Sequence, residues 1–371
     1  MSESPDRSPD SLARLLTLGD VEAAAATVLP RMALDYYRSG ADDEHTLRQN
    51  RRAFRRWEIW YRVLVDVAQR SLGTTLLGTG VSAPILIAPT AYHRMAHPEG
   101  ELATARAAAA AGAVYVVSTL ATTRLEDVAA ASSGPKWFQL YVHKDRGFTR
   151  SLVERAEAAG YLALVLTVDA PLLGRRLADE RNLFTLPAGM TMANLAGASG
   201  LSSSLEEQSM LARYVASRHD ASLTWKDLDW LRELTSLPLL VKGIVRGDDA
   251  RRALDHGVSG IVVSNHGGRQ LDGAPASIEA LPGVVAAVAG RCPVLVDGGV
   301  RCGTDVLKAL ALGAAAVLVG RPILWGLAVG GAAGVERVLE ILRNELSMAM
   351  ALAGCPSLAD IDEDLVRRRQ R

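Results

Sequence analysis

The sequence has few cysteines, no net charge and no long apolar run, and each shortage excludes a class of protein. The three cysteines, Cys292, Cys302 and Cys355, have no CxxC spacing, which favours a reducing cytoplasm over a disulfide framework. Lys and Arg together number 41, as do Asp and Glu, so the formal charge is zero. Because nucleic-acid binding needs a basic face, this balance argues against a nucleic acid as the partner.

The chain also lacks the segments that direct a protein to a membrane. It contains no run of 18 apolar residues, so we expect no membrane span and no membrane partner. The first residues, MSESPDRSPDS, are polar and contain proline, which predicts a flexible tail over residues 1–15 and no signal peptide. Together these features predict a cytoplasmic protein.

What the sequence does contain is a series of short apolar runs that end at Gly, Asp, Asn or another polar residue. Because the runs are continuous rather than alternating, they predict strands that are buried on both faces. Alanine- and leucine-rich helical stretches lie between them, at the spacing that parallel crossovers need. The expected strands are 84–88, 114–118, 137–142, 162–169, 237–242, 260–265, 293–297 and 314–320, and the clearest helices are 98–111, 152–159, 248–256 and 304–312.

Eight strand-and-helix units predict an α/β fold, a (β/α)₈ TIM barrel that forms a single domain over residues 16–371. A doubly wound sheet is the alternative, but the chain has no early GxGxxG motif to support it. Residues 16–80 precede the barrel and are expected to form a helical extension. About 70 residues separate the fourth and fifth strands, and their small, polar centre predicts a mobile lid loop at about 188–224.

The last two strands of the predicted barrel lead into glycine and arginine. They continue as DGGVRCG and GRP, in the two loops where barrels commonly bind phosphate through backbone N–H groups. Glycine lets the backbone close on an anion, and Arg301 and Arg321 can add charge-assisted hydrogen bonds. We therefore predict a phosphate site, in preference to tight turns with surface arginines. Cys302 lies in the same loop and is interpreted only as a small filler.

The sixth strand leads into SNHGGRQLDG, which places His266 and Arg269 close together. A base beside a guanidinium group can hold and deprotonate a substrate that carries an acid. Lys242 ends the fifth strand and is expected to face an anion or an electron-rich cofactor ring. Asp169 either turns the chain after the fourth strand or orients a base, and Arg176 either binds substrate or lies on the surface.

These motifs together resemble one family. The segments SNHGGRQLDG, LTVDAPLLGRR, LVKGI, DGGVRCGTDVLKALALGA and GRP, with DYYRSGADDE, IAPTAYHRMAHPEGE, WFQLYV and SLTWKDLDWL, resemble the FMN-dependent (S)-2-hydroxy acid oxidases and dehydrogenases. That family includes glycolate oxidase, lactate oxidase, mandelate dehydrogenase and hydroxymandelate oxidase. The resemblance runs from about residue 20 to residue 357. It implies an FMN cofactor, no metal, and a homo-oligomer, namely a tetramer.

The resemblance also implies a role for each matching residue. His266 would be the base and Asp169 would hold its other nitrogen, while Lys242 would stabilise the reduced flavin. The substrate carboxylate and hydroxyl would be bound by Tyr36, Tyr141, Arg176 and Arg269. FMN would be contacted from all eight strand ends, by Pro89, Thr90, Ala91, Ser118, Gln139, Thr167, Lys242, Ser264, Asp297, Gly298, Gly299, Arg301, Gly320 and Arg321.

One position predicts a larger substrate. Glycolate oxidases have a tryptophan where this chain has Leu120, and Leu120 and Tyr92 are similar to the hydroxymandelate-type oxidases. We therefore expect an aromatic or medium-length aliphatic 2-hydroxy acid. The loop after the fourth strand is polar and only about 80 residues precede the barrel, which favours O₂ as the electron acceptor, with H₂O₂ as product, over a quinone or a cytochrome. An FMN-dependent isomerase is a further alternative, which the Arg–His–Arg set argues against, and a non-enzymatic phosphate-binding barrel is the last.

Overall fold

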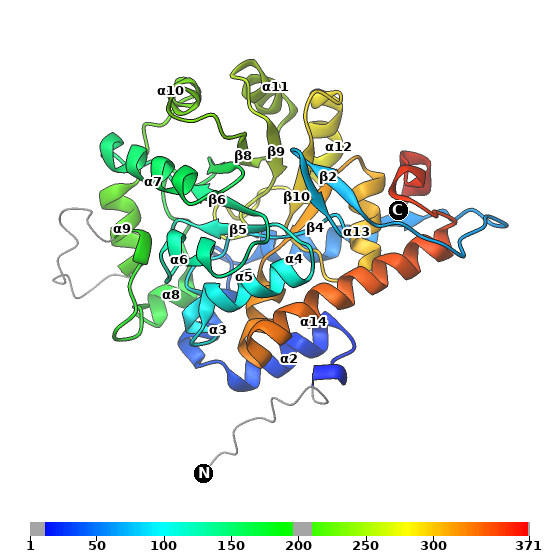
Figure 1. Cartoon of the computed structure of the whole chain (residues 1–371), viewed down its shortest axis with the longest axis horizontal. Helices are drawn as coiled ribbons and strands as arrows, with labels where there is room; N and C mark the ends of the chain where they lie inside the picture. The colour runs from blue at the N-terminus through cyan, green and yellow to red at the C-terminus, as the bar shows by residue number, and fades with distance from the viewer. Residues whose placement is uncertain (1–11, 196–209, 370–371) are drawn as a thin grey trace, which may run out of the picture.

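The computed structural model describes residues 12–195 and 210–369, and its centre is a closed barrel of eight parallel strands in chain order (Figure 1). Strand β11 pairs with β4 and closes the ring, with Leu318 beside Leu86. The TIM barrel is confirmed, and every predicted strand is present. The barrel strands are β4 (Ile85–Ile87), β5 (Tyr115–Ser118), β6 (Lys136–Leu140), β7 (Leu164–Thr167), β8 (Leu239–Ile244), β9 (Gly260–Val263), β10 (Val294–Asp297) and β11 (Ala316–Val319).

Alternate residues of the strands pack into two separate apolar clusters. One cluster contains Leu86, Val116, Leu240 and Leu295 and joins all eight strands, so it fills the inside of the barrel. The other cluster lies between the strands and the helices that surround them. Because both faces of each strand are covered, both alternating sets of residues are apolar, and this produces the continuous runs in the sequence.

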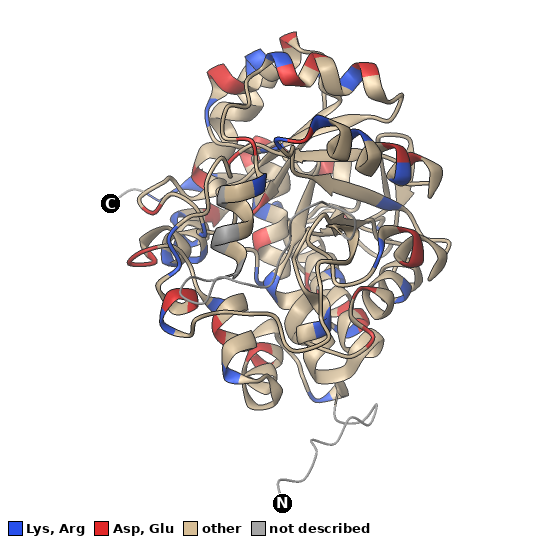
Figure 2. Cartoon of the chain, turned by 90° about the vertical axis from the view of Figure 1, so that its left-hand side faces the viewer, with Lys and Arg blue, Asp and Glu red and all other residues tan. Residues whose placement is uncertain are grey.

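The surrounding helices cover the outside of the barrel (Figure 1). Acidic and basic residues are interspersed along these helices in Figure 2, as expected for a chain without net charge. The predicted helices correspond to α5, α7, α11 and α13. The full set is α5 (Gly100–Ala110), α6 (Leu125–Ala130), α7 (Arg146–Ala158), α10 (Lys226–Leu234), α11 (Gly247–Asp255), α12 (Ser277–Val288), α13 (Gly303–Ala311) and α14 (Arg321–Ala353).

Helix α14 is the one helix in the described part of the chain that has the length and composition to cross a membrane. Two-thirds of its most apolar window, 67%, is buried inside the protein. The helix is also interrupted, because Gly330 and Gly331 have non-helical backbone angles. Its apolar residues therefore pack against the barrel and the neighbouring helices.

The N-terminal extension is helical only in its first half. Helices α2 (Leu18–Val28), α3 (Arg31–Arg38) and α4 (His45–Arg52) are present as expected. The prediction is wrong for the second half, which contains β1 (Trp57–Ile59) and the hairpin of β2 (Thr74–Leu76) and β3 (Thr79–Val81).

The hairpin turn explains why the second half is not helical. Leu77 and Gly78 both have positive φ, as a two-residue hairpin turn requires. Thr and Val beside this turn favour strands. Leu76 and Val81 then join the apolar cluster inside the barrel, so the hairpin closes one end of it.

The long connection between β7 and β8 contains helices α8 (Leu177–Arg181) and α9 (Met210–Arg218) ahead of α10. The centre of the predicted lid loop, residues 196–204, lies outside the described residues, so its mobility stays a prediction. Helix α9 packs onto the barrel through the buried side chains of Leu211, Tyr214 and Val215.

Candidate active site

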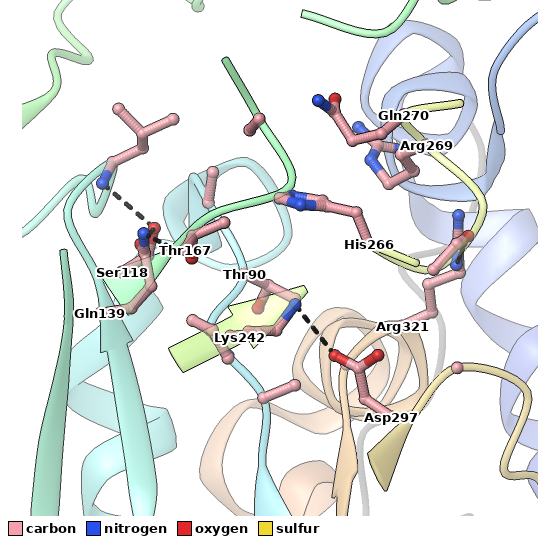
Figure 3. A pocket seen from close by; sticks show the side chains of 18 of the residues that line it. Thr90, Ser118, Gln139, Thr167, Lys242, His266, Arg269, Gln270, Asp297 and Arg321 are labelled. Atoms are coloured by element: carbon pink, nitrogen blue, oxygen red, sulfur yellow. Dashed lines mark hydrogen bonds and ion pairs between the residues drawn. The ribbon is translucent and has the colours of Figure 1, made fainter. Parts of the chain in front are cut away.

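A cavity lies at the carboxyl ends of the barrel strands, and it brings together most of the residues predicted from the sequence (Figure 3). Three predicted residues, Tyr92, Asp169 and Ser264, do not line it. The predicted residues that do line it are Tyr36, Pro89, Thr90, Ala91, Ser118, Leu120, Gln139, Tyr141, Thr167, Arg176, Lys242, His266, Arg269, Asp297, Gly298, Gly299, Arg301, Gly320 and Arg321.

The candidate base, His266, is held by Asp169. Nδ1 of His266 lies 2.8 Å from Oδ1 of Asp169, which leaves Nε2 as the nitrogen that can accept a proton. Burial lowers the pKa of His266 below 6.5, although the charge of Asp169 opposes this shift. Burial alone would raise the pKa of Asp169, but the attraction of His266 and Lys242 keeps it below 3.8. The pair is therefore a neutral imidazole beside a carboxylate, which is suited to general base catalysis.

The loop after β9 needs the two glycines that follow His266. His266 itself has a φ of 58°, and Gly267 and Gly268 have φ values of 65° and 74°, a region that favours glycine. A Cβ atom on Gly268 would lie 2.6 Å from the backbone nitrogen of Leu47. The glycines thus let the loop turn closely against the N-terminal extension, so that His266 and Arg269 both face the cavity.

Lys242 is a buried cation at the floor of the cavity (Figure 3). Its Nζ lies 3.0 Å from Oδ2 of Asp297 and donates to Oγ of Ser264 at 2.9 Å. Burial lowers the pKa of Lys242, but Asp297 and Asp169 outweigh it, so the pKa stays above 10.5 and the ammonium is charged. Ser264, which was expected to touch the flavin, is fully buried and also accepts from the backbone nitrogen of His266 at 3.0 Å. It therefore positions the cation and the base.

A second wall of the cavity carries uncharged polar groups. Gln139 accepts from Oγ of Ser118 at 3.3 Å and donates to Oγ1 of Thr167 at 3.1 Å. Thr90 lies 2.6 Å from Nε2 of the buried His93. These bonds fix the direction of each group before a ligand arrives. Donors and acceptors of this kind suit the polar edge of a flavin ring.

The far end of the cavity is built for an anion. Gly298 and Gly299 have φ values of 92° and 95°, and a Cβ on Gly299 would lie 2.0 Å from the carbonyl oxygen of Asn50. Burial lowers the pKa of Arg301 to about 10, and its Nε has no hydrogen-bond partner among the described residues. A partly buried, partly unsatisfied guanidinium beside close-packed glycines fits the phosphate of FMN.

Arg321 lines the cavity, as its motif suggested, and also joins two parts of the chain. Its guanidinium lines the cavity but donates to three backbone carbonyls, those of Tyr37, Gly267 and Ser39, at 2.9–3.0 Å. Burial and the nearby positive charges of Arg269 and Arg301 hold its pKa well below 12.5. Arg321 therefore fastens the N-terminal extension to the barrel, and its remaining N–H groups and charge favour an anion.

Two further arginines lie on the side of His266. Arg269 donates to the carbonyls of Tyr36 and Ser39 at 2.7 and 2.8 Å. Arg176 is only 6% exposed, and its closest acid, Asp179, lies 3.9 Å away. Nε of Arg176 has no hydrogen-bond partner within the described residues. Arg176 can therefore bind a second anion, such as a substrate carboxylate, next to the base.

The predicted substrate residues separate into lining and supporting groups. Tyr36 lines the cavity, and its ring is stacked on Phe184 with centroids 4.4 Å apart. Tyr92 is fully buried, and its ring lies 5.4 Å from that of Tyr36, so it supports Tyr36 from behind. Leu120 lines the cavity, as expected.

Some lining residues were missed by the sequence reasoning. Leu211 and Val215 of α9 and His219 after it also line the cavity. The helical spacing of positions 211 and 215 was the only available signal for them.

Gln270 was also missed by the sequence reasoning. Its side chain bridges two loops of the site. It donates to the carbonyls of Asp169 and Leu172 at 3.0 and 2.8 Å and accepts from the nitrogen of Gly174 at 3.0 Å. The loop that carries the base is thus joined to the loop that carries Arg176. Its position directly after Arg269 in the SNHGGRQLDG motif was the available signal.

Comparisons with known proteins agree with this geometry. A family model described as FMN-dependent dehydrogenase matches residues 25–368. An L-lactate oxidase of Nostoc sp. is 57% identical over 352 residues, which cover 94% of this chain and 96% of that protein. The 2-hydroxyacid oxidase 1 of Homo sapiens is 54% identical over 364 residues, 96% of this chain and 98% of that protein. A solved structure of mandelate oxidase with (S)-4-hydroxymandelic acid has a TM-score of 0.89 at 48% identity, covering 93% of this chain and 96% of that one.

Proposed function

Because the chain belongs to the FMN-dependent dehydrogenase family, we propose that it oxidises an (S)-2-hydroxy acid larger than glycolate to the 2-oxo acid, with O₂ as the electron acceptor and H₂O₂ as product. The cofactor is FMN, as the motifs implied. When bound, FMN would accept the two electrons and one of the two protons that leave the substrate. The observation that carries the proposal is the His266–Asp169 pair, which lies beside the unsatisfied Arg176 in a cavity floored by charged Lys242.

The residues of this chain can perform the rest of the reaction. Arg176 and Arg269 hold the substrate carboxylate, which fixes the carbon that carries the hydroxyl group. Nε2 of His266 accepts a proton, and the carboxylate of Asp169 stabilises the imidazolium that forms. Tyr141 lines the same part of the cavity and contacts the hydroxyl or the carboxylate of the substrate. Lys242 supplies a positive charge where negative charge develops.

The preference for a larger acid rests on apolar side chains that line the cavity. Leu120, Leu211 and Val215 are among them, and none of these side chains can donate a hydrogen bond to a polar substituent. An apolar side chain gains about 25 cal/mol for each Å² that it buries there. Similarity to mandelate oxidase supports the same preference.

The proposal is tested by anaerobic titration of the holoenzyme with glycolate, lactate, mandelate and a longer 2-hydroxy acid. We expect mandelate or the longer acid to bleach the flavin absorbance, and air to restore it with one H₂O₂ for each substrate oxidised. If none of the four acids bleaches the flavin, the proposed function is wrong. If bleaching occurs but air does not restore the colour, the acceptor is a quinone or a cytochrome instead of O₂.

Leu120→Trp is expected to shift the preference toward small substrates. The larger indole would occupy part of the cavity and leave no room for the aromatic group of the substrate. We expect kcat/KM for mandelate to fall about 10- to 100-fold, in the range that one or two lost apolar groups produce, while kcat/KM for glycolate is kept or rises. The ratio of the two values is the measurement. An unchanged ratio would remove Leu120 from the set of specificity residues.

The pH dependence of kcat/KM is expected to report the titration of His266. Only the neutral imidazole is a base, and its pKa is lowered by burial. We therefore expect kcat/KM to rise with pH and to level off above an apparent pKa that lies below 6.5. Asp169→Asn removes the negative charge that opposes the lowering of the His266 pKa. The acidic limb of the kcat/KM profile should therefore move to lower pH, and the plateau value of kcat/KM should fall. A limb that does not move in Asp169→Asn would contradict this assignment.

The proposal extends to assembly and location. The family resemblance supports a homotetramer, and the sparse cysteines without CxxC spacing support a cytoplasmic location. The partners are then the 2-hydroxy acid, O₂ and further copies of the chain.

A further inference from the structure

Two histidines that have no part in the proposed chemistry lie behind Tyr141. His219 follows α9, and its ring is stacked on that of Tyr141, with centroids 4.6 Å apart and planes at 29°. His143 meets the edge of His219 at 5.8 Å and 84°. Both histidines are at least 95% buried. Tyr141 is therefore backed by rigid rings where it borders the cavity.

The two histidines are anchored from several directions. His143 is hydrogen-bonded through Nε2 to the hydroxyl of Tyr214 at 2.5 Å, and the Tyr214 ring meets His219 at 5.3 Å and 82°. The backbones of His143 and His219 form an antiparallel bridge. The segment that follows helix α9 is thus joined to the residues that follow β6.

The rings carry no charge near neutral pH. Burial lowers the pKa of His143 to about 4 and that of His219 to about 3. They therefore place no positive charge beside His266. Their contribution to the site is one of shape and hydrogen bonding.

A second cavity explains why Tyr141 needs this support. It lies behind the first cavity and is lined by Tyr141 and His219 together with Trp225 and Leu228. Tyr141 and His219 line both cavities, so the two stacked rings are part of the partition between them. Without the ring of His219, the side chain of Tyr141 would have free space behind it and further rotamers to adopt.

We propose that His219 is a positioning residue for Tyr141, and that the ring stack directs the Tyr141 hydroxyl toward the substrate. This inference rests on the proposed function, in which Tyr141 contacts the substrate hydroxyl or carboxylate. The stack removes rotamers of Tyr141 that point into the second cavity. The side chain of Tyr141 then loses its conformational entropy during folding, so this loss does not weaken substrate binding.

The test compares three variants of the holoenzyme with the acid that bleaches the flavin. His219→Ala opens the second cavity and is expected to lower kcat/KM about tenfold, within the range caused by small misplacements of a reacting group. His219→Phe keeps a ring of similar shape and should retain more than about half of the wild-type kcat/KM. His45→Ala is the matched control, because His45 is exposed and does not line either cavity.

A double-mutant cycle with Tyr141→Phe then shows whether His219 acts through the Tyr141 hydroxyl. We expect His219→Ala to change kcat/KM less than about twofold in the Tyr141→Phe background. Equal effects in both backgrounds, or a His219→Phe variant as impaired as His219→Ala, would overturn the inference. An unchanged kcat/KM in Tyr141→Phe alone would overturn it as well, together with the predicted Tyr141 contact.

Binding without turnover separates this inference from the proposed function. The affinity of the oxidised holoenzyme for a 2-oxo acid, read from the change in flavin absorbance, should fall about tenfold in His219→Ala and recover in His219→Phe. This measurement needs no oxidation of any substrate. Equal affinities in wild type and His219→Ala would overturn the inference even if the enzyme oxidises 2-hydroxy acids, while failure of every acid to bleach the flavin would overturn the proposed function.

Discussion

Replacing His266 by alanine is expected to lower kcat by about 10²- to 10⁴-fold, which is the usual contribution of a positioned general base. The imidazole lines the cavity and is held by a carboxylate, with Nδ1 at 2.8 Å from Oδ1 of Asp169. After the substitution, Asp169 has lost the imidazole that it orients, and the nitrogen that accepts the proton is gone. Stopped-flow measurement of flavin bleaching under anaerobic conditions follows this step directly.

The same variant should still bind FMN. The groups that fit the phosphate lie on the loop after β10, around Gly299 and Arg301, whereas His266 lies after β9. We expect an unchanged flavin absorbance after desalting, with His45→Ala as a control for the loss of a histidine. Loss of FMN in His266→Ala would show that the residue supports the cofactor, and normal bleaching would remove it as the base.

Arg176→Leu is expected to lower kcat/KM about 30- to 4,000-fold. Breaking a buried charge pair with a ligand costs about 2–5 kcal/mol, and about 1.4 kcal/mol corresponds to a factor of ten. Arg176 is 6% exposed and its Nε has no partner within the described chain, so its free hydrogen-bonding capacity faces the cavity. The change should raise KM strongly and leave FMN bound.

Arg176 is a better test of the carboxylate site than Arg269. Arg269 already donates to the carbonyls of Tyr36 and Ser39, so its removal would also loosen the N-terminal extension. The matched control is Arg175→Leu, because the Arg175 side chain is 65% exposed and pairs with Glu180 on the surface. Equal losses in the two variants would contradict the role of Arg176.

Arg176→Lys refines the same test. Lysine keeps the charge but not the planar pair of donors that matches a carboxylate. We therefore expect a kcat/KM for Arg176→Lys that lies between those of the wild type and Arg176→Leu.

The barrel could be predicted because burial on both faces of each strand leaves a direct pattern in the sequence. The strand ends then placed His266, Lys242 and Asp297 on one rim, since the carboxyl ends of parallel strands meet at the same edge. The local chain could not show which way a side chain turns after its strand ends. Only the structure shows that Oγ of Ser264 accepts from Lys242 and from the backbone nitrogen of His266, while its contact with the flavin stays a prediction.

The sequence by itself determined the α/β barrel, the glycine-rich anion loops and the chemical groups of the active site. These properties depend on local periodicity, on glycine at positive φ and on the residue types at strand ends. Only the tertiary structure placed Tyr92 behind Tyr36, joined two loops through Gln270 and stacked His219 on Tyr141. Each of these contacts joins segments that are far apart in the chain. Their geometry comes from packing between elements, so the spacing of residues within one segment carries no trace of it.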